Sequence, residues 1–270
     1  MKCSVAGIAC GLALSLTGGN AAGIDWELSG QIAGELRLFP SKPAFAEQED
    51  HALTPSLIAE PRLVVRPDSD GIARMSVVPH ARWDPHGQYS DVDFREANLL
   101  LVGRGWDLVL GIDRRFWGVT ESLHLVDVIN QTDMADGPDS ETKLGQPMVN
   151  LNLIGRLGTL SLFALPGFVE RNFADAGARL QGPYEIDREA EYASARGDDH
   201  VDYALRYAHT IGPVDVGLSH FRGTGREPHF RPRIDMPGFR VVLTPYYEQI
   251  EQTGLDLQLT RGAWLWKLEA

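Results

Sequence analysis

The chain has 270 residues, 43% of them hydrophobic, and a formal net charge of −12 at pH 7. This acidity disfavours a nucleic-acid partner, because binding to phosphates requires basic surfaces. Beyond residue 22 there is no long apolar run, which excludes a helical membrane protein but leaves a β-barrel open, since barrel strands are apolar only at alternate residues.

The N-terminus has the pattern of a secretory signal peptide. A short basic start is followed by an apolar stretch from Val5 to Leu16 and then by small residues. This stretch is shorter than the ~20 residues that a membrane-spanning helix needs, so we expect residues 1–22 to be a cleaved signal peptide. A lipoprotein anchored through Cys10 is the weaker alternative. Cleavage would remove Cys3 and Cys10, and the mature part, residues 23–270, would then hold no disulfide and no thiolate metal site.

After this segment hydrophobicity alternates with a period of two, which indicates β-strands. The first strand carries its apolar residues on one parity: Trp26, Leu28, Ile32, Leu36 and Leu38. Further stretches with this alternation include residues 62–66, 73–83, 106–113, 149–153, 201–207 and 255–259, and a last run begins at residue 264. We expect about eleven strands.

Two features interrupt the alternation. Pro61 and Pro79 fall inside neighbouring strands, where a missing N–H breaks the ladder of hydrogen bonds. In residues 92–101 the apolar parity changes between Phe94 and Leu99, and a β-bulge near Glu96 would restore it.

The connections between the strands alternate in length. Long or medium connections span residues 40–55, 84–91, 114–147, 166–199 and 222–240; short ones span residues 67–71, 103–105, 155–158, 210–214 and 260–263. Short turns on one side and long loops on the other are typical of outer-membrane barrels. The sequence therefore predicts an all-β fold, an up-and-down antiparallel transmembrane β-barrel.

Aromatic residues support this prediction in part. Trp26, Trp106, Trp264 and Trp266 begin strands at the short-turn end, as an interfacial girdle would require. Phe39 and Trp83 lie at the opposite ends of their strands. The alternative is that these are ordinary core aromatics of a soluble protein.

The strand count predicts an incomplete barrel. Bacterial single-chain barrels have an even number of strands, whereas we count about eleven. The sequence also stops within a strand at Leu268-Glu269-Ala270, without a final aromatic residue. We expect further strands to follow.

The third long loop, residues 114–147, carries the densest group of candidate site residues. These are Arg114, Arg115, Glu121, His124, Asp127 and Asp133. In porin-like barrels a long third loop folds into the lumen, where such charges would form a constriction and set selectivity. The alternative is a solvated outer loop without a role in the pore.

Alternation also places a row of arginines on the proposed lumen wall. They are Arg37, Arg62, Arg66, Arg74, Arg82 and Arg206. They would attract anionic solutes into a water-filled pore. The interpretation that we favour is simpler: they pair with carboxylates of neighbouring strands, such as Glu35, Glu60 and Asp93.

Catalysis and metal binding have weak support. Ser122, His124 and Asp127 lie too close on one segment for a converging triad, and no Gly-x-Ser-x-Gly turn is present. No His, Asp or Glu group has the spacing of a known metal site. We therefore expect no enzyme activity, no cofactor and no metal, and keep an outer-membrane lipid hydrolase as a distant rival.

Several segments beyond about residue 110 resemble an uncharacterised family of Gram-negative outer-membrane β-barrel proteins of porin-like character. The matching segments are residues 117–122, 128–133, 144–148, 165–168, 217–221, 244–250 and 252–255. The resemblance implies a barrel in the cell outer membrane, and it supplies neither a substrate nor catalytic residues.

The expected function is passage of small hydrophilic solutes through an aqueous barrel, filtered by the loop of residues 114–147. The expected partners are outer-membrane lipid, the solute and the outer-membrane assembly machinery, and homo-oligomerisation is left open. The main rival is a non-conducting surface barrel that binds a partner through its long outer loops.

Overall fold

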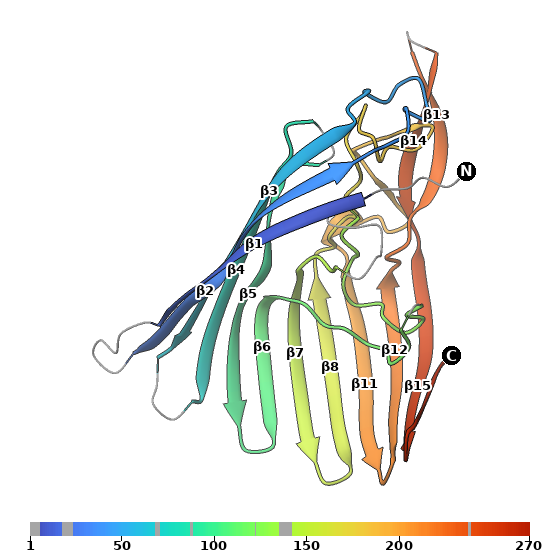
Figure 1. Ribbon diagram of the computed structural model, residues 1–270. Helices are drawn as coiled ribbons and strands as arrows, with labels where there is room; N and C mark the ends of the chain where they lie inside the picture. The colour runs from blue at the N-terminus through green and yellow to red at the C-terminus, as the bar shows by residue number, and fades with distance from the viewer. Residues whose placement is uncertain are drawn as a thin grey trace.

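One antiparallel sheet dominates the computed structural model (Figure 1), which describes residues 6–17, 24–67, 71–86, 89–121, 123–134, 142–236 and 239–270, with side chains from residue 24 onward. In these residues the sheet has twelve strands in chain order. They are β1 (Ala6–Thr17), β2 (Asp25–Leu38), β3 (Leu53–Arg66), β4 (Ala73–Trp83), β5 (Asp91–Gly103), β6 (Trp106–Asp113), β7 (Gln146–Gly155), β8 (Gly158–Pro166), β11 (Val201–Ile211), β12 (Val214–Thr224), β15 (Gln249–Arg261) and β16 (Trp264–Glu269).

The topology confirms the predicted fold class. Every neighbouring pair in the sheet is antiparallel, and the eleven strands from β2 onward match the expected number. Four turns at one end have two residues each: 104–105, 156–157, 212–213 and 262–263. The long connections lie at the other end. Among the described residues no helix is long and apolar enough to cross a bilayer.

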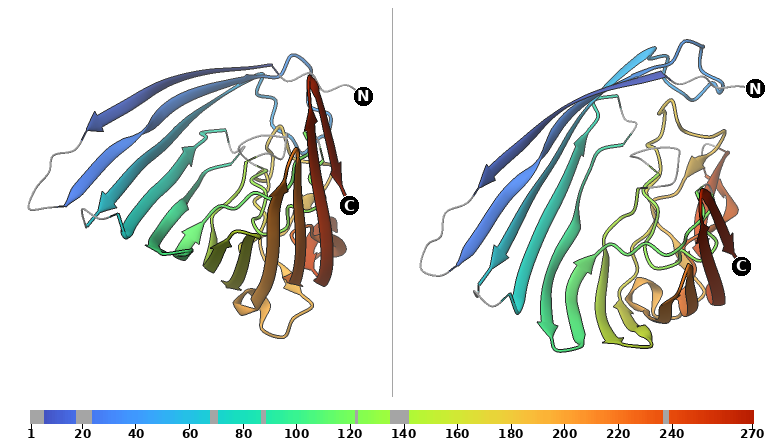
Figure 2. Two further views of the ribbon diagram at one scale, coloured as in Figure 1. Left: turned by 90° about the horizontal axis from the view of Figure 1, so that it is seen from below. Right: turned by 60° about the horizontal axis from the view of Figure 1, so that its bottom comes forward.

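The sheet curls into an open arc rather than a closed ring (Figure 2). β1 and β16 occupy the two ends of the strand order, and each pairs with a single neighbour within the described sheet. β1 coincides with the predicted signal peptide; its backbone pairs with β2 from Ala6↔Leu38 to Thr17↔Glu27. The edge of β2 would otherwise be unpaired, and such an edge readily accepts another extended segment. The pairing of β1 therefore does not decide whether this segment is a signal peptide, and cleavage after residue 22 stays a prediction.

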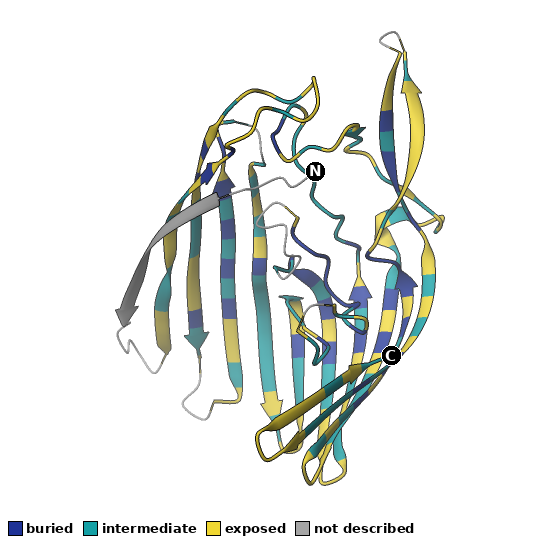
Figure 3. Ribbon diagram, turned by 45° about the vertical axis from the view of Figure 1, so that its right-hand side comes forward, coloured by how far each residue is buried: buried dark blue, intermediate teal, exposed yellow. Residues whose placement is uncertain are grey.

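The two faces of the arc differ in chemistry. Exposed residues alternate with less exposed ones along many of the strands (Figure 3), and large exposed apolar residues occupy the parity of the convex face. Examples from six strands are Ile32, Leu57, Met75, Val149, Leu162 and Leu205. The concave face carries buried charged residues, such as Arg82, Arg95 and Asp202. The convex face is therefore largely apolar, whereas the concave face combines buried charged residues with a group of buried apolar ones.

The prolines and the bulge have the predicted effects. Pairing of β3 with β4 stops after Ala59↔Ala81 and resumes at Leu63↔Val77, so the ladder is interrupted around both prolines. On the other side of β4, Val78 pairs with Glu96 and Pro79 with Phe94, which leaves one extra residue in β5. The expected bulge is confirmed, and the extra residue is Arg95.

The long loops build a second layer that the sequence did not predict. Strands β9 (Glu185–Ile186), β10 (Glu191–Tyr192), β13 (His229–Asp235) and β14 (Arg240–Tyr247) form a small sheet beyond the loop end of the arc, beside a short 3₁₀ turn, η1 (Gly197–Asp199). The ribbon of β13 and β14 projects past the other loops (Figure 1). Tyr247 is fully buried at its base and stacks on Tyr192, with 5.6 Å between the ring centroids.

The tryptophans assigned to the girdle are exposed, whereas Phe39 is buried. Trp106 and Trp83 are exposed on the convex face at opposite ends of their strands. Phe39 instead has the concave parity of β2 and is buried, with the Arg179 guanidinium 5.0 Å from its ring centroid.

Candidate functional site: the loop between β6 and β7

In the connection from β6 to β7, the described residues 114–121, 123–134 and 142–145 leave the wall and fold against the concave face of the arc (Figure 2). Asn130 holds its two ends together. The Asn130 side chain donates to the Asp113 and Leu144 carbonyls, each at 2.9 Å, and accepts from the Arg115 N–H at 2.8 Å. A single amide thus satisfies backbone groups that have left the ladder.

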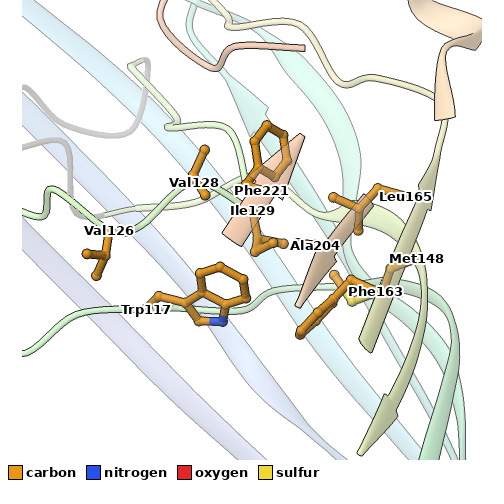
Figure 4. Packing of buried hydrophobic residues seen from close by; sticks show 9 residues of the cluster. All are labelled: Trp117, Val126, Val128, Ile129, Met148, Phe163, Leu165, Ala204 and Phe221. Carbon is orange, nitrogen blue, oxygen red and sulfur yellow. The ribbon is translucent and has the colours of Figure 1, made fainter. Parts of the chain in front are cut away.

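An apolar cluster seats the loop on the wall. Figure 4 shows loop residues Trp117, Val126, Val128 and Ile129 against wall residues Met148, Phe163, Leu165, Ala204 and Phe221. The Trp117 and Phe163 rings meet edge to face, 5.5 Å apart at an angle of 71°. Full burial of one such side chain contributes about 1.5–3 kcal/mol, so the cluster alone outweighs the ordering of a few loop residues.

A buried ion-pair network anchors the far side of the loop to β5. The Arg95 guanidinium pairs with Asp133 of the loop and lies 3.2 Å from Asp93 of its own strand. Asp133 also accepts from the Asn172 side chain at 2.6 Å. Only the bulge turns Arg95 toward this network, because Glu96 beside it points to the same face.

A second buried cation, in the segment that follows β12, holds the loop. Arg226 donates to Asp202 at 2.8 Å and to the Ile129 carbonyl at 2.9 Å. Its guanidinium also lies 5.1 Å from the Phe168 ring centroid. Burial lowers the pKa of Arg226, and the adjacent Asp202 carboxylate opposes this shift and keeps the cation paired.

The structure changes the assignment of two predicted constriction residues. Asp127 is buried, accepts from the Trp117 N–H at 3.1 Å and pairs with Lys143 at 2.9 Å. Asp133 is buried against Arg95. These carboxylates therefore hold the loop in place and do not face the interior of the arc. Each is paired with a cation, Lys143 or Arg95, that the sequence alone did not identify as its partner.

The other four candidates lie nearer to solvent. Arg114 pairs with Glu96 at 3.4 Å, and Arg115 with Asp113 at 2.8 Å. Glu121 is exposed and pairs with Lys267 of β16, and the His124 ring packs edge to face on Phe116. A cavity of about 440 Å³ opens here, lined by Phe116, Gly118, Val119, Thr120, Glu121, His124, Gln258 and Lys267.

The six wall arginines share the concave face, as predicted. Five have carboxylate partners: Arg37 and Arg82 with Glu35, Arg62 with Glu96, Arg66 with Asp25, and Arg206 with Asp256. Only the Arg66–Asp25 pair joins neighbouring strands as expected; Arg37 pairs within its own strand, and the other three arginines reach a carboxylate two strands away. Arg74 is exposed on the same face. The wall therefore presents ion pairs rather than an uncompensated positive stripe.

Sequence reasoning missed Arg95, Asp202 and Arg226 as structural residues of this site. The parity change near Glu96 was the available signal for Arg95. Arg226 gave none, because its partner Ile129 is 97 residues away in the chain.

The described residues bring together neither a complete catalytic trio nor a metal-binding cluster. Ser122 lies outside the described residues, so the Ser122, His124 and Asp127 trio is not tested. Within the described part of the chain no group of three or more His, Cys, Asp and Glu residues could hold a metal ion.

Comparisons with family models, with curated proteins and with solved structures found no match to this chain.

Proposed function

We propose that this chain is an outer-membrane β-barrel protein that passes small hydrophilic solutes, with residues 114–145 folded inward as a filter. The observation that carries this proposal is the polarity of the arc: exposed apolar residues cover its convex face, whereas its concave face carries buried charges around one apolar cluster. Lipid favours such a convex surface and excludes strands with unsatisfied polar groups.

The inward loop supports a channel that is narrowed rather than open. Its apolar cluster and two buried cations fill the space next to β7, β8, β11 and β12. Space remains beside β15 and β16, where the 440 Å³ cavity carries Glu121, Lys267 and His124. A solute passing there meets both signs of charge, which suits small polar solutes.

The membrane assignment is tested by placing one charge on each face. Leu162 of β8 lies on the convex face and is 39% exposed, whereas Gln258 of β15 faces the concave side. Leu162→Arg should destabilise the barrel in lipid by about 2–4 kcal/mol if the residue lies near the bilayer midplane. Gln258→Arg is the matched control and should be tolerated. A protein that stays in the soluble fraction without detergent would contradict the assignment.

The filter is tested by ion selectivity in planar bilayers. Glu121→Gln should move the reversal potential toward anion preference, and Lys267→Met should move it the other way, because these residues line the remaining cavity. Asp127→Asn is a useful contrast, since Asp127 is buried and should alter loop docking instead. A reversal potential unchanged in both cavity variants would remove this loop from the conduction path.

A second candidate is a non-conducting barrel that binds a partner through its outer loops. The observation that favours it is the projecting ribbon, where Ile234, Met236 and Phe239 are 63%, 66% and 75% exposed. Exposed apolar residues of this size commonly mark a contact surface. A folded barrel that is silent in planar bilayers would favour this function.

A further inference from the structure

The Glu269 carboxylate of β16 sits in an unusual environment inside the inward loop. Its Oε1 accepts from the Val119 N–H at 2.7 Å, from the Thr120 N–H at 2.9 Å and from the Thr120 hydroxyl at 2.8 Å. Its Oε2 accepts from the Leu125 N–H at 2.7 Å and the Val126 N–H at 3.4 Å. Both oxygens are therefore held by backbone donors of the loop.

The loop backbone is shaped for this contact. Gly118 has φ +127°, which side chains rarely adopt, and a Cβ there would lie 2.6 Å from Glu269 Oε1. Only glycine lets the carboxylate approach so closely. Converging N–H groups next to a glycine of positive φ form the kind of concavity that binds anions. We call Gly118, Val119, Thr120, Leu125 and Val126 the carboxylate nest.

A cavity gives access to the nest. The 440 Å³ cavity is lined by Gly118, Val119 and Thr120, and it also carries Lys267 and His124. Lys267 pairs with Glu121 at the exposed side of the loop. An anionic group that enters this cavity meets the Lys267–Glu121 pair, a cation beside a carboxylate, and Gly118, Val119 and Thr120 of the nest line the same cavity.

We propose that the carboxylate nest is a binding site for the carboxylate group of small solutes, and that Glu269 occupies it as a tethered internal ligand. The proposal rests on the proposed function, and it names the class of solute: small monocarboxylates. Recognition would use two oxygens and charge-assisted hydrogen bonds, as Glu269 does.

Competition for the nest would loosen the loop. Glu269 attaches the loop to β16, and two weaker contacts act alongside it: the Lys267–Glu121 pair and a bond from the Gln252 side chain to the Leu125 carbonyl at 2.8 Å. A solute that displaces Glu269 satisfies the same donors but removes the main attachment of this part of the loop to β16, while the apolar cluster and the contacts of Arg95 and Arg226 remain. The solute would thus widen its own path.

Hydrogen exchange of the loop amides tests the site in the full chain. In Glu269→Ala, exchange in a peptide that covers Val119, Thr120 and Leu125 should accelerate about tenfold or more, since the charged acceptor is lost. Acetate, titrated at constant ionic strength, should restore the protection. Acetamide has the same shape without the charge, and chloride has the charge without two oxygens; neither should restore it.

Two further variants protect the test against misfolding. Glu269→Gln keeps the shape of the side chain and should weaken protection less than Glu269→Ala. In Gly118→Ala the Cβ fills the nest, so acetate should have no effect. The proposal is overturned if exchange in Glu269→Ala equals that of the parent protein, or if acetate fails to slow it.

The readout separates this proposal from the channel function. Hydrogen exchange of the loop does not require ion flow. A barrel that does not conduct in bilayers but whose loop exchange responds to acetate would support the carboxylate nest and contradict the channel function. A conducting barrel whose loop exchange does not respond to acetate would support the channel function and contradict the carboxylate nest.

Discussion

His80 Nδ1 lies 3.2 Å from Glu60 Oε2, across the interruption in the ladder between β3 and β4. Pro61 and Pro79 prevent regular pairing at this point, and the backbone register resumes only at Leu63↔Val77. Both side chains face the concave side, and His80 is buried. The side-chain pair thus joins two strands where backbone hydrogen bonds are missing.

This relationship predicts a coupling energy between Glu60 and His80. We expect a double-mutant cycle with Glu60→Gln and His80→Gln to give a coupling of about 1–3 kcal/mol, because the pair is largely buried and has few backbone bonds beside it. The measurement is urea unfolding of the barrel in detergent. Strictly additive effects would show that the interruption needs no bridge.

Docking of the loop should depend on Trp117. Trp117→Ala removes the largest side chain of the apolar cluster and should destabilise the docked loop by about 3–5 kcal/mol. Phe116→Ala is the matched control, since the Phe116 side chain is 54% exposed. Hydrogen exchange of residues 123–134 should rise in the first variant only. Equal effects in both variants would contradict the packing described above.

The Arg95–Asp133 pair should contribute to stability and not to selectivity. Asp133→Asn leaves the buried Arg95 cation with Asp93 as its remaining carboxylate partner among these contacts, and should lower the free energy of unfolding by about 1.5–3 kcal/mol. Glu227→Gln is the control. The Glu227 side chain is 85% exposed beside Arg171, and such surface pairs contribute about 0–1 kcal/mol.

The outer layer should weaken in alkali through Tyr247. Burial raises the pKa of Tyr247 from its ordinary value of 10.0 to about 12. A phenol with a raised pKa stabilises the fold fully below the unfolded value, and this contribution is lost as pH rises from about 10 to about 12. The melting temperature should fall over this range, and less so in Tyr247→Phe. Tyr184→Phe, an exposed position, should follow the parent protein.

The strand pattern was predictable because alternation is a local property. Each strand of the large sheet from β2 onward shows its apolar face in its own residues, and the bulge at Arg95 left a visible change of parity. These features depend on sequence neighbours alone.

The contacts of the loop were not predictable, because they join residues that are distant in the sequence. Asp127 and Asp133 are typical of exposed pore charges in sequence, yet each is buried by a partner that the fold supplies, Lys143 and Arg95. The outer sheet has the same origin: the strand pair β10–β14 joins Glu191 to Tyr246, two segments that belong to different loops.

The anchors of the inward loop also imply an order of assembly. Most adjacent strands of the wall are close in sequence and can pair as hairpins. In contrast, Ile129 contacts Arg226, which lies 97 residues later in the chain, and Val119 contacts Glu269, which lies 150 residues later. Closing such long segments is entropically slower than zipping neighbouring hairpins. We therefore expect the strands of the wall to pair first. The inward loop should dock last, after β16 has paired with β15.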